Sequence, residues 1–566
     1  MMDRERADAA EADALRRQIV EAVAANGGHL AAALGVVELA IALRRTFSPP
    51  SDKVLWDVGH QAYAWKLLTG RAEGFKRLRR IDGVSGFPWP DESPCDAFVA
   101  GHAGSALAAA FGLAAGFQVK AKGESPHIVA VVGDASLANG ESLEALSAAR
   151  SLDGKVIVVV NDNAAEGAWH PDGAFFGAFG IRSLGPVDGH DVEAVSAALE
   201  AAKREDRTVA VHVVTKKGKG FAPAEEDPVA WHSVGPFKFR VQSSEFRVQS
   251  SELDDALENV NSKLETQNSK LQTPIWSAVF GEAMCEAAHR DEKVCAVVAA
   301  MGHGTGLDGF AREFPERFFD VGIREEMAVT FAAGLAKAGL KPVVAIYSTF
   351  LQRAVDQIQH DVCLQRLPVV FAVDRAGCVG EDGATHHGLY DIPLLRPLTG
   401  MRILAPCCAD DLKEMLASAL AGDGPVAIRY PKGVAPATLN PQPTTQNSKL
   451  KTLNSKLLLC AVGDQVAKAK AVKELLAAAG VEAVVIPVRD VKPPAIMREQ
   501  VKGLLVTLEN GVVVGGFGES IGADMRFGWP DAVVGHGPVE ALEREFGFDA
   551  ASVARTILER MGVKHG

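Results

Sequence analysis

The sequence has no C-x-x-C pair, and its cysteines form no pattern typical of a disulfide or zinc framework. The eight cysteines are scattered over 566 residues, apart from the adjacent Cys407 and Cys408. We therefore expect reduced thiols in a cytoplasmic protein. No apolar run approaches the roughly 20 residues that a membrane-spanning helix needs. The charged first residues, MMDRERADAAEADALRRQ, lack the apolar stretch of a secretory signal. We expect no membrane partner.

Basic residues are fewer than acidic ones. The chain has 59 Lys and Arg residues against 71 Asp and Glu residues, and its net charge is −12. This balance argues against nucleic acid or an anionic membrane as the main partner. A phosphate-bearing substrate must instead meet a local cluster of basic residues. Hydrophobic residues make up 48% and charged residues 23%, which is typical of a globular protein with large cores, and the length predicts about three or four domains.

Two polar, repetitive segments interrupt the globular pattern. The string FRVQSSE occurs twice in tandem, at 239–245 and 246–252, and NSKL recurs in both segments. A seven-residue repeat can indicate a coiled coil, but Ser, Gln, Asn and Thr dominate and apolar positions are too sparse for a seam. We interpret the segments as low-complexity linkers. The resulting division is 1–238, linker 239–274, 275–436, linker 437–457, and 458–566.

Short β-branched runs alternate with helix-like stretches in all three parts. Examples are Val156–Val160 in the first part, Val294–Val298 in the second and Ala532–Val534 in the third. Such alternation predicts an α/β fold of three domains, each with a mainly parallel sheet flanked by helices. Three domains of this kind indicate a multidomain enzyme rather than a scaffold.

The stretch from Val129 to Asn163 has the pattern strand, turn, helix, strand. Gly133-Asp134 ends the first apolar run, and Asn161-Asp162-Asn163 ends the second. Both clusters are expected at the carboxyl ends of neighbouring parallel strands, where open α/β sheets bind ligands. The Asp134 carboxylate and the Asn163 amide oxygen can then hold Mg²⁺ together with phosphate oxygens. An ordinary turn after the first strand is the alternative.

Histidines stand in Gly-rich loops of the first part. His29, His60 and His102 each follow a glycine beside a helix-like segment, and His232 lies in DPVAWHSVG. Imidazoles in such loops can bind polar substrate groups or relay protons near neutrality. Structural hydrogen bonding is the alternative for each of them.

Charged residues at strand and helix ends mark the second part. Glu325 precedes an Ala-rich, helix-forming run, so it either interacts with the helix dipole or is held for proton transfer. Arg375 and Arg429 each follow an apolar strand-like run. Two arginines at strand ends suit bidentate recognition of a phosphate, with surface ion pairing as the alternative. The same part contains Tyr347, Arg353, Asp382 and His386.

Several strings together resemble one family. WDVGHQAY at 56–63, YSTFLQRA at 347–354 and DRAGCVGEDGATHHG at 374–388 are highly specific in this order. With VGIREEMAVTFAAGLA and IRYPKG, they resemble the 1-deoxy-D-xylulose-5-phosphate synthase family, whose members are thiamine-diphosphate enzymes related to transketolase. The resemblance runs from about Leu15 to the C-terminus, excluding the linkers, and implies a transketolase-like fold.

The resemblance implies a reaction and a set of roles. The reaction is the decarboxylative condensation of pyruvate with D-glyceraldehyde 3-phosphate, in isoprene and thiamine biosynthesis, by a homodimer whose cofactor lies between the first two domains. Metal ligands would be Asp134, Asn163 and the backbone near Ala165. Catalytic residues would be Glu325, His29, His232 and His386. Cofactor contacts would be His60, His102, Gly133, Asp134, Ala135, Asn163, Phe221, Glu325 and Phe350. The substrate phosphate would meet Tyr347, Arg353, Arg375, Asp382 and Arg429.

The sequence departs from the family pattern at defined places. Ala135 replaces a glycine, GHAGSA replaces GHSSTS, and Arg324, Glu326 and Met327 flank Glu325 in place of the usual residues. The long insertion that normally follows the position of Asn163 is missing, which predicts a more open site. The alternatives are another thiamine-diphosphate carboligase or transketolase with an altered donor or acceptor, and a binding paralogue without catalysis.

Overall fold

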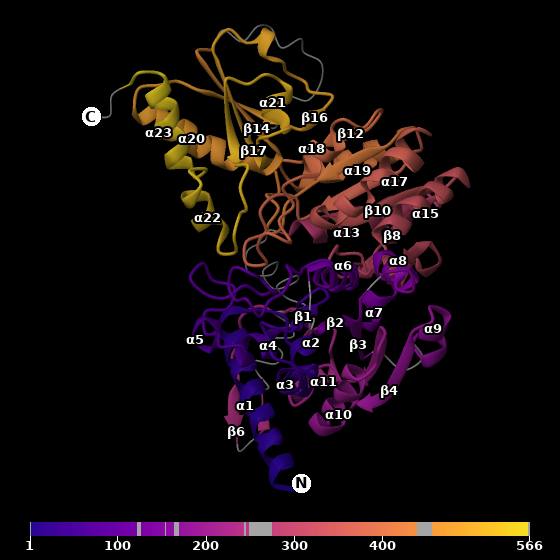
Figure 1. Cartoon of the computed structure of the whole chain (residues 1–566). Helices are drawn as coiled ribbons and strands as arrows, with labels where there is room; N and C mark the ends of the chain where they lie inside the picture. The colour runs from indigo at the N-terminus through magenta and orange to yellow at the C-terminus, as the bar shows by residue number, and fades with distance from the viewer. Residues whose placement is uncertain are drawn as a thin grey trace. The chain divides into compact units, whose positions relative to one another are not determined.

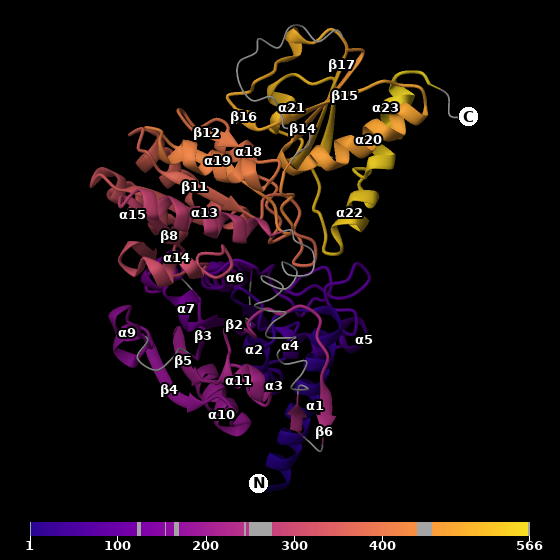
Figure 2. The same ribbon diagram turned by 180° about the vertical axis from the view of Figure 1, so that it is seen from behind.

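The computed structural model describes residues 2–120, 126–152, 154–163, 169–242, 245–247, 274–438 and 455–563. The chain divides into two compact units, Met1–Thr266 and Gln267–Gly566, and Figures 1 and 2 show their elements from two sides. Among the described residues, no helix is both long and apolar enough to cross a membrane.

A five-stranded, wholly parallel sheet forms the centre of the first unit (Figure 1). In spatial order its strands are β1 (Lys53–Trp56), β2 (Ile128–Gly133), β3 (Val156–Asp162), β5 (Val209–Val214) and β4 (Arg182–Asp188). Side chains alternate between the two faces of a strand. Val158 and Val160 therefore pack in one layer, and Ile157 and Val159 pack in the other.

Helices cover both faces of this sheet. The face of Val158 packs against α6 (Ser105–Lys120), α8 (Gly140–Ala148) and α9 (Gly173–Ala178). The opposite face packs against α1 (Met2–Asn26), α3 (Val37–Thr46), α4 (Tyr63–Leu68) and α10 (Val192–Lys203). The short helices are α2 (Ala31–Gly35), α5 (Ala72–Phe75), α7 (Asp134–Leu137) and α11 (Ala222–Glu226). Asp191 caps α10 by accepting from the amides of Glu193 and Ala194, a contact worth about 1 kcal/mol.

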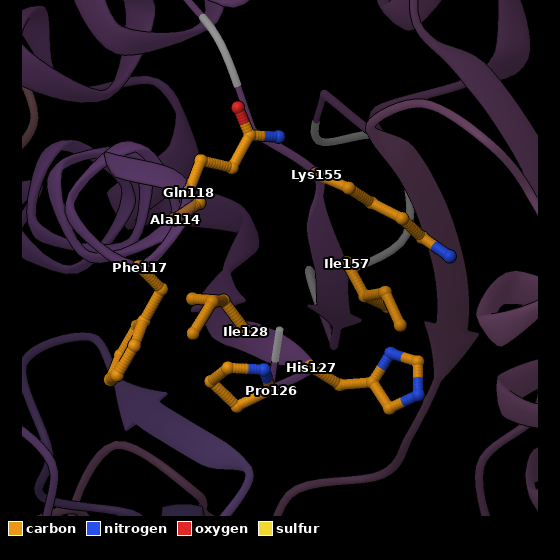
Figure 3. Close-up of a pocket in the computed structure, with 8 residues that line it drawn as sticks. All are labelled: Ala114, Phe117, Gln118, Pro126, His127, Ile128, Lys155 and Ile157. Carbon is orange, nitrogen blue, oxygen red and sulfur yellow. The ribbon is translucent and has the colours of Figure 1, made fainter. Parts of the chain in front are cut away.

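A small cavity lies at the amino-terminal ends of β2 and β3 (Figure 3). Its volume is about 180 Å³, and Phe117, His127 and Lys155 are among the residues that line it. Ligand sites of parallel α/β sheets lie at the carboxyl ends of strands. The cavity is therefore at the opposite edge of the sheet from Asp134 and Asn163.

Two short segments of the tandem FRVQSSE repeat pair as antiparallel strands at the start of the first linker. Its strands are β6 (Arg240–Gln242) and β7 (Glu245–Arg247), and Val241 pairs with Phe246. The described pairing thus covers only the junction of the two copies. Residues 248–273 and 439–454, which make up most of the two predicted linkers, lie outside the described residues.

A seven-stranded sheet occupies the first part of the second unit. Six of its strands are parallel. In spatial order they are β12 (Arg402–Leu404), β13 (Val426–Arg429), β11 (Val370–Asp374), β10 (Lys341–Tyr347), β8 (Val294–Val298) and β9 (Phe318–Asp320). One face packs on α13 (Trp276–Arg290), α14 (Asp308–Glu313) and α19 (Ala409–Leu420). The other packs on α15 (Glu325–Lys337), α18 (Asp391–Leu395) and a π-helix at Ile358–Cys363.

A four-stranded parallel sheet forms the rest of the second unit. In spatial order its strands are β15 (Val484–Val488), β14 (Leu457–Val462), β17 (Leu504–Val512) and β18 (Met525–Trp529). One face packs on α20 (Val466–Ala478), α22 (Val539–Glu545) and α23 (Ala550–Arg560). Three predominantly parallel sheets flanked by helices therefore confirm the predicted fold class.

The two sheets of the second unit are joined by a strand and by a shared core. Strand β16 (Asp490–Lys492) comes from the third predicted part, yet it pairs antiparallel with β12 and completes the seven-stranded sheet. Leu458 and Phe517 belong to the same buried cluster as Val344 and Phe371. The second and third parts are thus continuous in packing.

The last strand of the third part was predicted at the wrong place. Residues Ala532–Val534 are not a strand, and β18 instead covers Met525–Trp529. Arg526 and Gly528 interrupt the apolar run within this strand, so a search for apolar runs does not find it. Pro530 follows it directly and has no amide proton to continue the ladder.

Candidate active site

Asp134 and Asn163 lie in contact at the carboxyl ends of β2 and β3. Asp134 is the first residue of α7, directly after Gly133 at the end of β2. The Asn163 amide donates to Asp134 Oδ2 at 3.1 Å, and the Ala135 amide donates to Oδ1 at 2.6 Å. The structure therefore brings together the two residues predicted to hold a metal. Ala165 lies outside the described residues.

A series of hydrogen bonds between side chains sets the orientation of the side-chain amide of Asn163. Thr215 donates its hydroxyl to Asn161 Oδ1 at 2.6 Å and accepts from Asn163 Nδ2 at 3.4 Å. Asn161 in turn donates to Gln61 at 2.9 Å. Because Asn163 turns its nitrogen toward Thr215, its Oδ1 oxygen is the atom left for a hard cation.

The substitution at Ala135 leaves the turn intact. Ala135 is exposed, whereas Asp134 beside it is 8% exposed. The added methyl group therefore points to solvent and does not crowd the carboxylate. The departure from the family pattern does not remove the predicted ligand.

Asp57 organises the loop of His102, and the sequence reasoning missed it. Its carboxylate is 1% exposed and accepts from the amides of Gly104 and Ala106, both at 2.9 Å. Ser136 also donates to it. Gly104 has φ +92, and a Cβ there would lie 2.5 Å from Asn139 Oδ1, so this turn needs glycine. The only available signal was an aspartate directly after a strand, in WDVGH.

Three of the predicted histidines converge in the first unit. Ring centroids of His29 and His60 lie 5.5 Å apart, those of His29 and His232 lie 5.6 Å apart, and those of His60 and His232 lie 5.2 Å apart. His232 is exposed to solvent, yet desolvation by the surrounding groups lowers its pKa, with a further contribution from the charge of Lys217. The shift favours the neutral form of the His232 imidazole.

Phe221, predicted to contact the cofactor, lies in the core of the first unit. Its side chain is 0% exposed, and its ring packs edge-on against Trp231 at 5.1 Å. A direct cofactor contact by this side chain is not supported, because the ring lies wholly in the core. Its packing instead supports the segment that carries His232.

Glu325 is a buried carboxylate with spare hydrogen-bonding capacity. It is the first residue of α15 and is 3% exposed. Its Oε2 atom has no hydrogen-bond partner among the described residues. Burial raises its pKa, which the nearby Arg353 charge partly offsets. A buried acceptor without a partner is costly, so this position suits a ligand that donates a hydrogen bond.

The turn before Glu325 is held by one of the residues that depart from the family pattern. Arg324 donates to the carbonyl of Val321 at 2.5 Å. The guanidinium thus braces the turn that leads into α15.

Aromatic rings and Arg375 form a layer at the ends of β10 and β11. Phe350 stacks on Tyr347 with centroids 5.7 Å apart and meets His386 edge-on at 5.7 Å. The Arg375 guanidinium lies 4.1 Å from the centre of the Tyr347 ring, and burial raises the pKa of Tyr347 to about 12. Arg375 has φ 54, a strained conformation for a residue with a side chain, and such strain is common at functional sites.

Arg429 is committed to protein groups. It is 3% exposed and donates from Nε to Asp391 Oδ2 at 2.6 Å and from a terminal nitrogen to the Asn510 carbonyl at 2.8 Å. The adjacent carboxylate outweighs desolvation and raises its pKa. This placement does not support the predicted phosphate contact, because the guanidinium joins the seven-stranded sheet to β17. Asp382 and Arg353 are less buried and remain nearer to solvent.

Comparisons with known proteins cover most of the chain. A family model described as 1-deoxy-D-xylulose-5-phosphate synthase matches residues 4–169 and 164–215. The transketolase pyrimidine binding domain matches 272–437, and the transketolase C-terminal domain matches 447–553. A 1-deoxy-D-xylulose-5-phosphate synthase of Geobacter sulfurreducens is 40% identical over 622 residues, covering 96% of this chain and 95% of the relative. The chain belongs to the 1-deoxy-D-xylulose-5-phosphate synthase family.

A second curated relative agrees with this assignment. A 1-deoxy-D-xylulose-5-phosphate synthase of Oleidesulfovibrio alaskensis is 39% identical, covering 98% of this chain and 95% of the relative. Among solved structures, a transketolase from Campylobacter jejuni matches 97% of the chain at 20% identity with a TM-score of 0.47. By its family, which the curated relatives show, the chain is a transferase, and membership supports thiamine diphosphate as its cofactor.

Members of the family carry residues that this chain lacks. The aligned lengths of 622 and 629 residues exceed the 566 residues of the chain. The two matches to the synthase model, 4–169 and 164–215, meet just after Asn163. This agrees with the predicted shortening at that point.

Proposed function

We propose that the chain condenses pyruvate with D-glyceraldehyde 3-phosphate to give 1-deoxy-D-xylulose 5-phosphate and CO₂. The observation that carries this proposal is the buried Glu325 carboxylate, whose Oε2 atom lacks a hydrogen-bond partner within the described part of the chain. Thiamine diphosphate, when bound, supplies the carbon nucleophile and the electron sink for loss of CO₂. The residues of the chain bind and orient the reactants and move protons.

The first unit supplies the diphosphate contacts. In the proposal, Asp134 and Asn163 provide one carboxylate and one amide oxygen to Mg²⁺, which keeps further positions for diphosphate oxygens and water. The contact between the two residues at 3.1 Å supports this role. The His102 loop, fixed by Asp57 through Gly104 and Ala106, lies at the neighbouring strand end.

The second unit supplies the contact to the pyrimidine ring. Glu325 Oε2 would accept a hydrogen bond from a ring nitrogen and so control where the proton of that ring resides. A carboxylate with a raised pKa exchanges a proton more readily near neutral pH. Phe350, stacked on Tyr347, would offer an aromatic surface to the same ring.

The histidine cluster would serve the reacting oxygens. His29, His60 and His232 lie within 5.6 Å of one another, centroid to centroid. Neutral imidazoles can donate a hydrogen bond to a substrate carbonyl and accept a proton from a hydroxyl. His386, packed on Phe350, would do the same from the second unit.

Arg375 and Arg353 would bind the phosphate of the acceptor. Arg375 is held above Tyr347, and Asp382 contributes to the charge balance around it. In an acidic chain, a phosphorylated aldehyde requires cationic side chains at its binding site. Arg429 enters this proposal as a structural support of β13 rather than as a ligand.

An assay with purified protein tests the proposal. Pyruvate and D-glyceraldehyde 3-phosphate, with thiamine diphosphate and Mg²⁺, should release CO₂ and form 1-deoxy-D-xylulose 5-phosphate. A protein that binds the cofactor but releases no CO₂ from this pair would contradict it. That result would favour a second candidate, a related carboligase with another donor or acceptor, which the shortened segment after Asn163 motivates. The expected homodimer is tested by sedimentation velocity, and the cytoplasmic location stays a prediction.

A further inference from the structure

Asp162 is a buried carboxylate between two imidazoles, directly beside Asn163. It is the last residue of β3 and is 2% exposed. His212 Nε2 on β5 lies 2.7 Å from Oδ2, and His170 Nδ1 lies 2.9 Å from Oδ1 and 3.0 Å from Oδ2. An ionised carboxylate only accepts hydrogen bonds, so both rings donate to it. We call Asp162, His170 and His212 the histidine clamp.

The backbone around the clamp connects it to the proposed metal residues. The Asp162 carbonyl accepts from the Thr215 amide at 2.8 Å. The next amide, that of Asn163, donates to Asp134 at 3.1 Å. The peptide between Asp162 and Asn163 is thus tied to β5 on one side and to the end of β2 on the other. The side chain of Asp162 adds a third attachment, its hydrogen bond from His170.

His170 stands where this chain is shorter than its relatives. The two matches to the family model meet at residues 164–169, and Trp169 and His170 are the next described residues. Trp169 packs on Phe175 with centroids 5.1 Å apart. Asp172 caps α9 by accepting from the Phe175 amide at 2.8 Å. His170 therefore belongs to a segment that is fastened on its C-terminal side.

A buried residue fixes that segment to the sheet. Phe176 in α9 is 0% exposed and belongs to the same core as Val158 and Val160 of β3. Asp162 follows these two valines at the same spacing of two residues and so faces the same side. His170 thus reaches Asp162 from an anchored element, while its own side chain is 45% exposed.

We propose that His170 is a positioning residue for the metal half of the site, acting through Asp162 to orient Asn163. The inference rests on the proposed function, because it takes Asp134 and Asn163 as the Mg²⁺ ligands. Partners one shell outside a metal commonly change its affinity by roughly 10- to 100-fold when removed. The clamp would thereby help to fix the orientation of Asn163 at the point where this chain is shorter than its relatives.

The two imidazoles use different nitrogens, which makes the proposal testable atom by atom. The amide nitrogen of asparagine can replace the Nδ1 donor of histidine, and that of the longer glutamine can replace Nε2. His170→Asn and His212→Gln should therefore retain the clamp. His170→Gln and His212→Asn should break it. Asparagine and glutamine exchange roles between the two positions, whereas a general effect of losing a ring predicts equal losses from both substitutions at each position.

The experiment is a calorimetric titration of Mg²⁺ into the full chain with saturating thiamine diphosphate. His170→Gln and His212→Asn should raise the Mg²⁺ dissociation constant by roughly tenfold or more, while His170→Asn and His212→Gln stay within about threefold of the wild type. At saturating Mg²⁺, His170→Gln should recover most of its kcat, because Asp134 and Asn163 are still present. His289→Asn is the matched control, since His289 pairs with Glu313 on the surface of the other unit.

The outcomes separate the two proposals. Equal Mg²⁺ affinity in the wild type and His170→Gln would overturn the clamp while leaving the proposed function standing. Equal losses in His170→Asn and His170→Gln would also overturn it, because the Nδ1 bond would then be irrelevant. A wild type that binds no Mg²⁺ with thiamine diphosphate would overturn both. Thermal unfolding of each variant checks that the protein is folded, and the exposed position of His170 favours this.

Discussion

The Oε2 atom of Glu325 lies 3.8 Å from the Nε atom of Arg353, within ion-pair distance but beyond that of a hydrogen bond. Arg353 also lies 3.6 Å from Glu326 Oε1. Its charge is therefore shared between a buried and a partly exposed carboxylate. Burial raises the pKa of Glu325 and the Arg353 charge lowers it, but Arg353 donates no hydrogen bond to Oε2, so a ligand can complete the hydrogen bonding of this atom.

Glu325→Gln should bind thiamine diphosphate within a few-fold of the wild type but lose at least about 100-fold in kcat, because an amide cannot take up the ring proton. Calorimetry measures the binding, and steady-state kinetics measure kcat. Glu326→Gln, one residue further along α15, is the matched control and should remain active. A Glu325→Gln enzyme within a few-fold of wild-type kcat would falsify the proton role.

Arg353→Met should raise the pKa of Glu325 further, since the Arg353 charge lowers it in the native protein. The limb of the kcat profile that disappears in Glu325→Gln should move to higher pH in Arg353→Met. The KM for D-glyceraldehyde 3-phosphate should also rise if Arg353 contacts its phosphate. A limb that stays in place or moves to lower pH would show that the two side chains are not coupled as the geometry indicates.

Asp134→Asn and Asn163→Ala should each weaken Mg²⁺ binding in the presence of thiamine diphosphate by at least about tenfold, because each removes a ligand atom of a hard cation. The Asp134 variant should lose more, since it also loses a negative charge. Calorimetric titration of Mg²⁺ provides the measurement, and Asp308→Asn in the other unit, where Asp308 pairs with His303, serves as control. Unchanged affinity in both variants would place the metal elsewhere.

Arg429→Met and Asp391→Asn should each destabilise the fold by about 3–5 kcal/mol, because each leaves a buried charged partner unpaired. Thermal unfolding detects this loss. Where the variants remain folded, both substrates should be affected to a similar extent. The opposite pattern, a normal melting temperature with a KM increase only for the phosphorylated aldehyde, would restore Arg429 as a phosphate ligand.

Glu509 should make stability depend on pH. It is 0% exposed, and burial raises its pKa to about 7 from 4.5. A carboxyl group with a raised native pKa binds its proton more tightly when folded, so its contribution is complete below pH 4.5 and is lost as pH rises to about 7. Relative to Glu509→Gln, the wild type should lose about 3 kcal/mol across this range, at 1.36 kcal/mol per pKa unit.

The prediction concerns how the stability difference between the wild type and Glu509→Gln changes from one pH to another. Phe517 and Gly518 both donate to the Glu509 carboxylate, and glutamine can satisfy only one of them. That cost is the same at each pH and cancels from the comparison. Unfolding of the two proteins at pH 5 and pH 8 tests the prediction, and parallel stability curves would count against a buried, titrating Glu509.

The fold class and the meeting of Asp134 with Asn163 could be predicted because both follow from local sequence patterns. Alternating β-branched runs predicted the α/β class, because a parallel strand buried on both faces needs an apolar run such as Val156–Val160. The spacing of Gly133-Asp134 and Asn163 predicted their meeting, because neighbouring parallel strands end at one edge. These inferences need no knowledge of distant contacts.

Contacts between distant segments could not be read in the same way. Arg429 is the last residue of β13, one position from the predicted place, but its partner Asp391 lies 38 residues earlier, and nothing local identifies the pair. Asp57 binds two amides 47 and 49 residues away. The position of Phe221 in the core likewise depends on Trp231 and Phe237, which only the folded chain brings together.

Strand β16 has a consequence for how the polypeptide can be cut. Because Asp490–Lys492 pairs with β12 and Leu458 shares a core with Phe371, cleavage of the backbone between residues 439 and 454 would leave the two fragments associated. Expressed separately, the fragment that ends before residue 439 would expose the unpaired edge of β12, which would promote aggregation. Co-expressed fragments should reassemble, so this stretch is suited to splitting the gene rather than to isolating a domain.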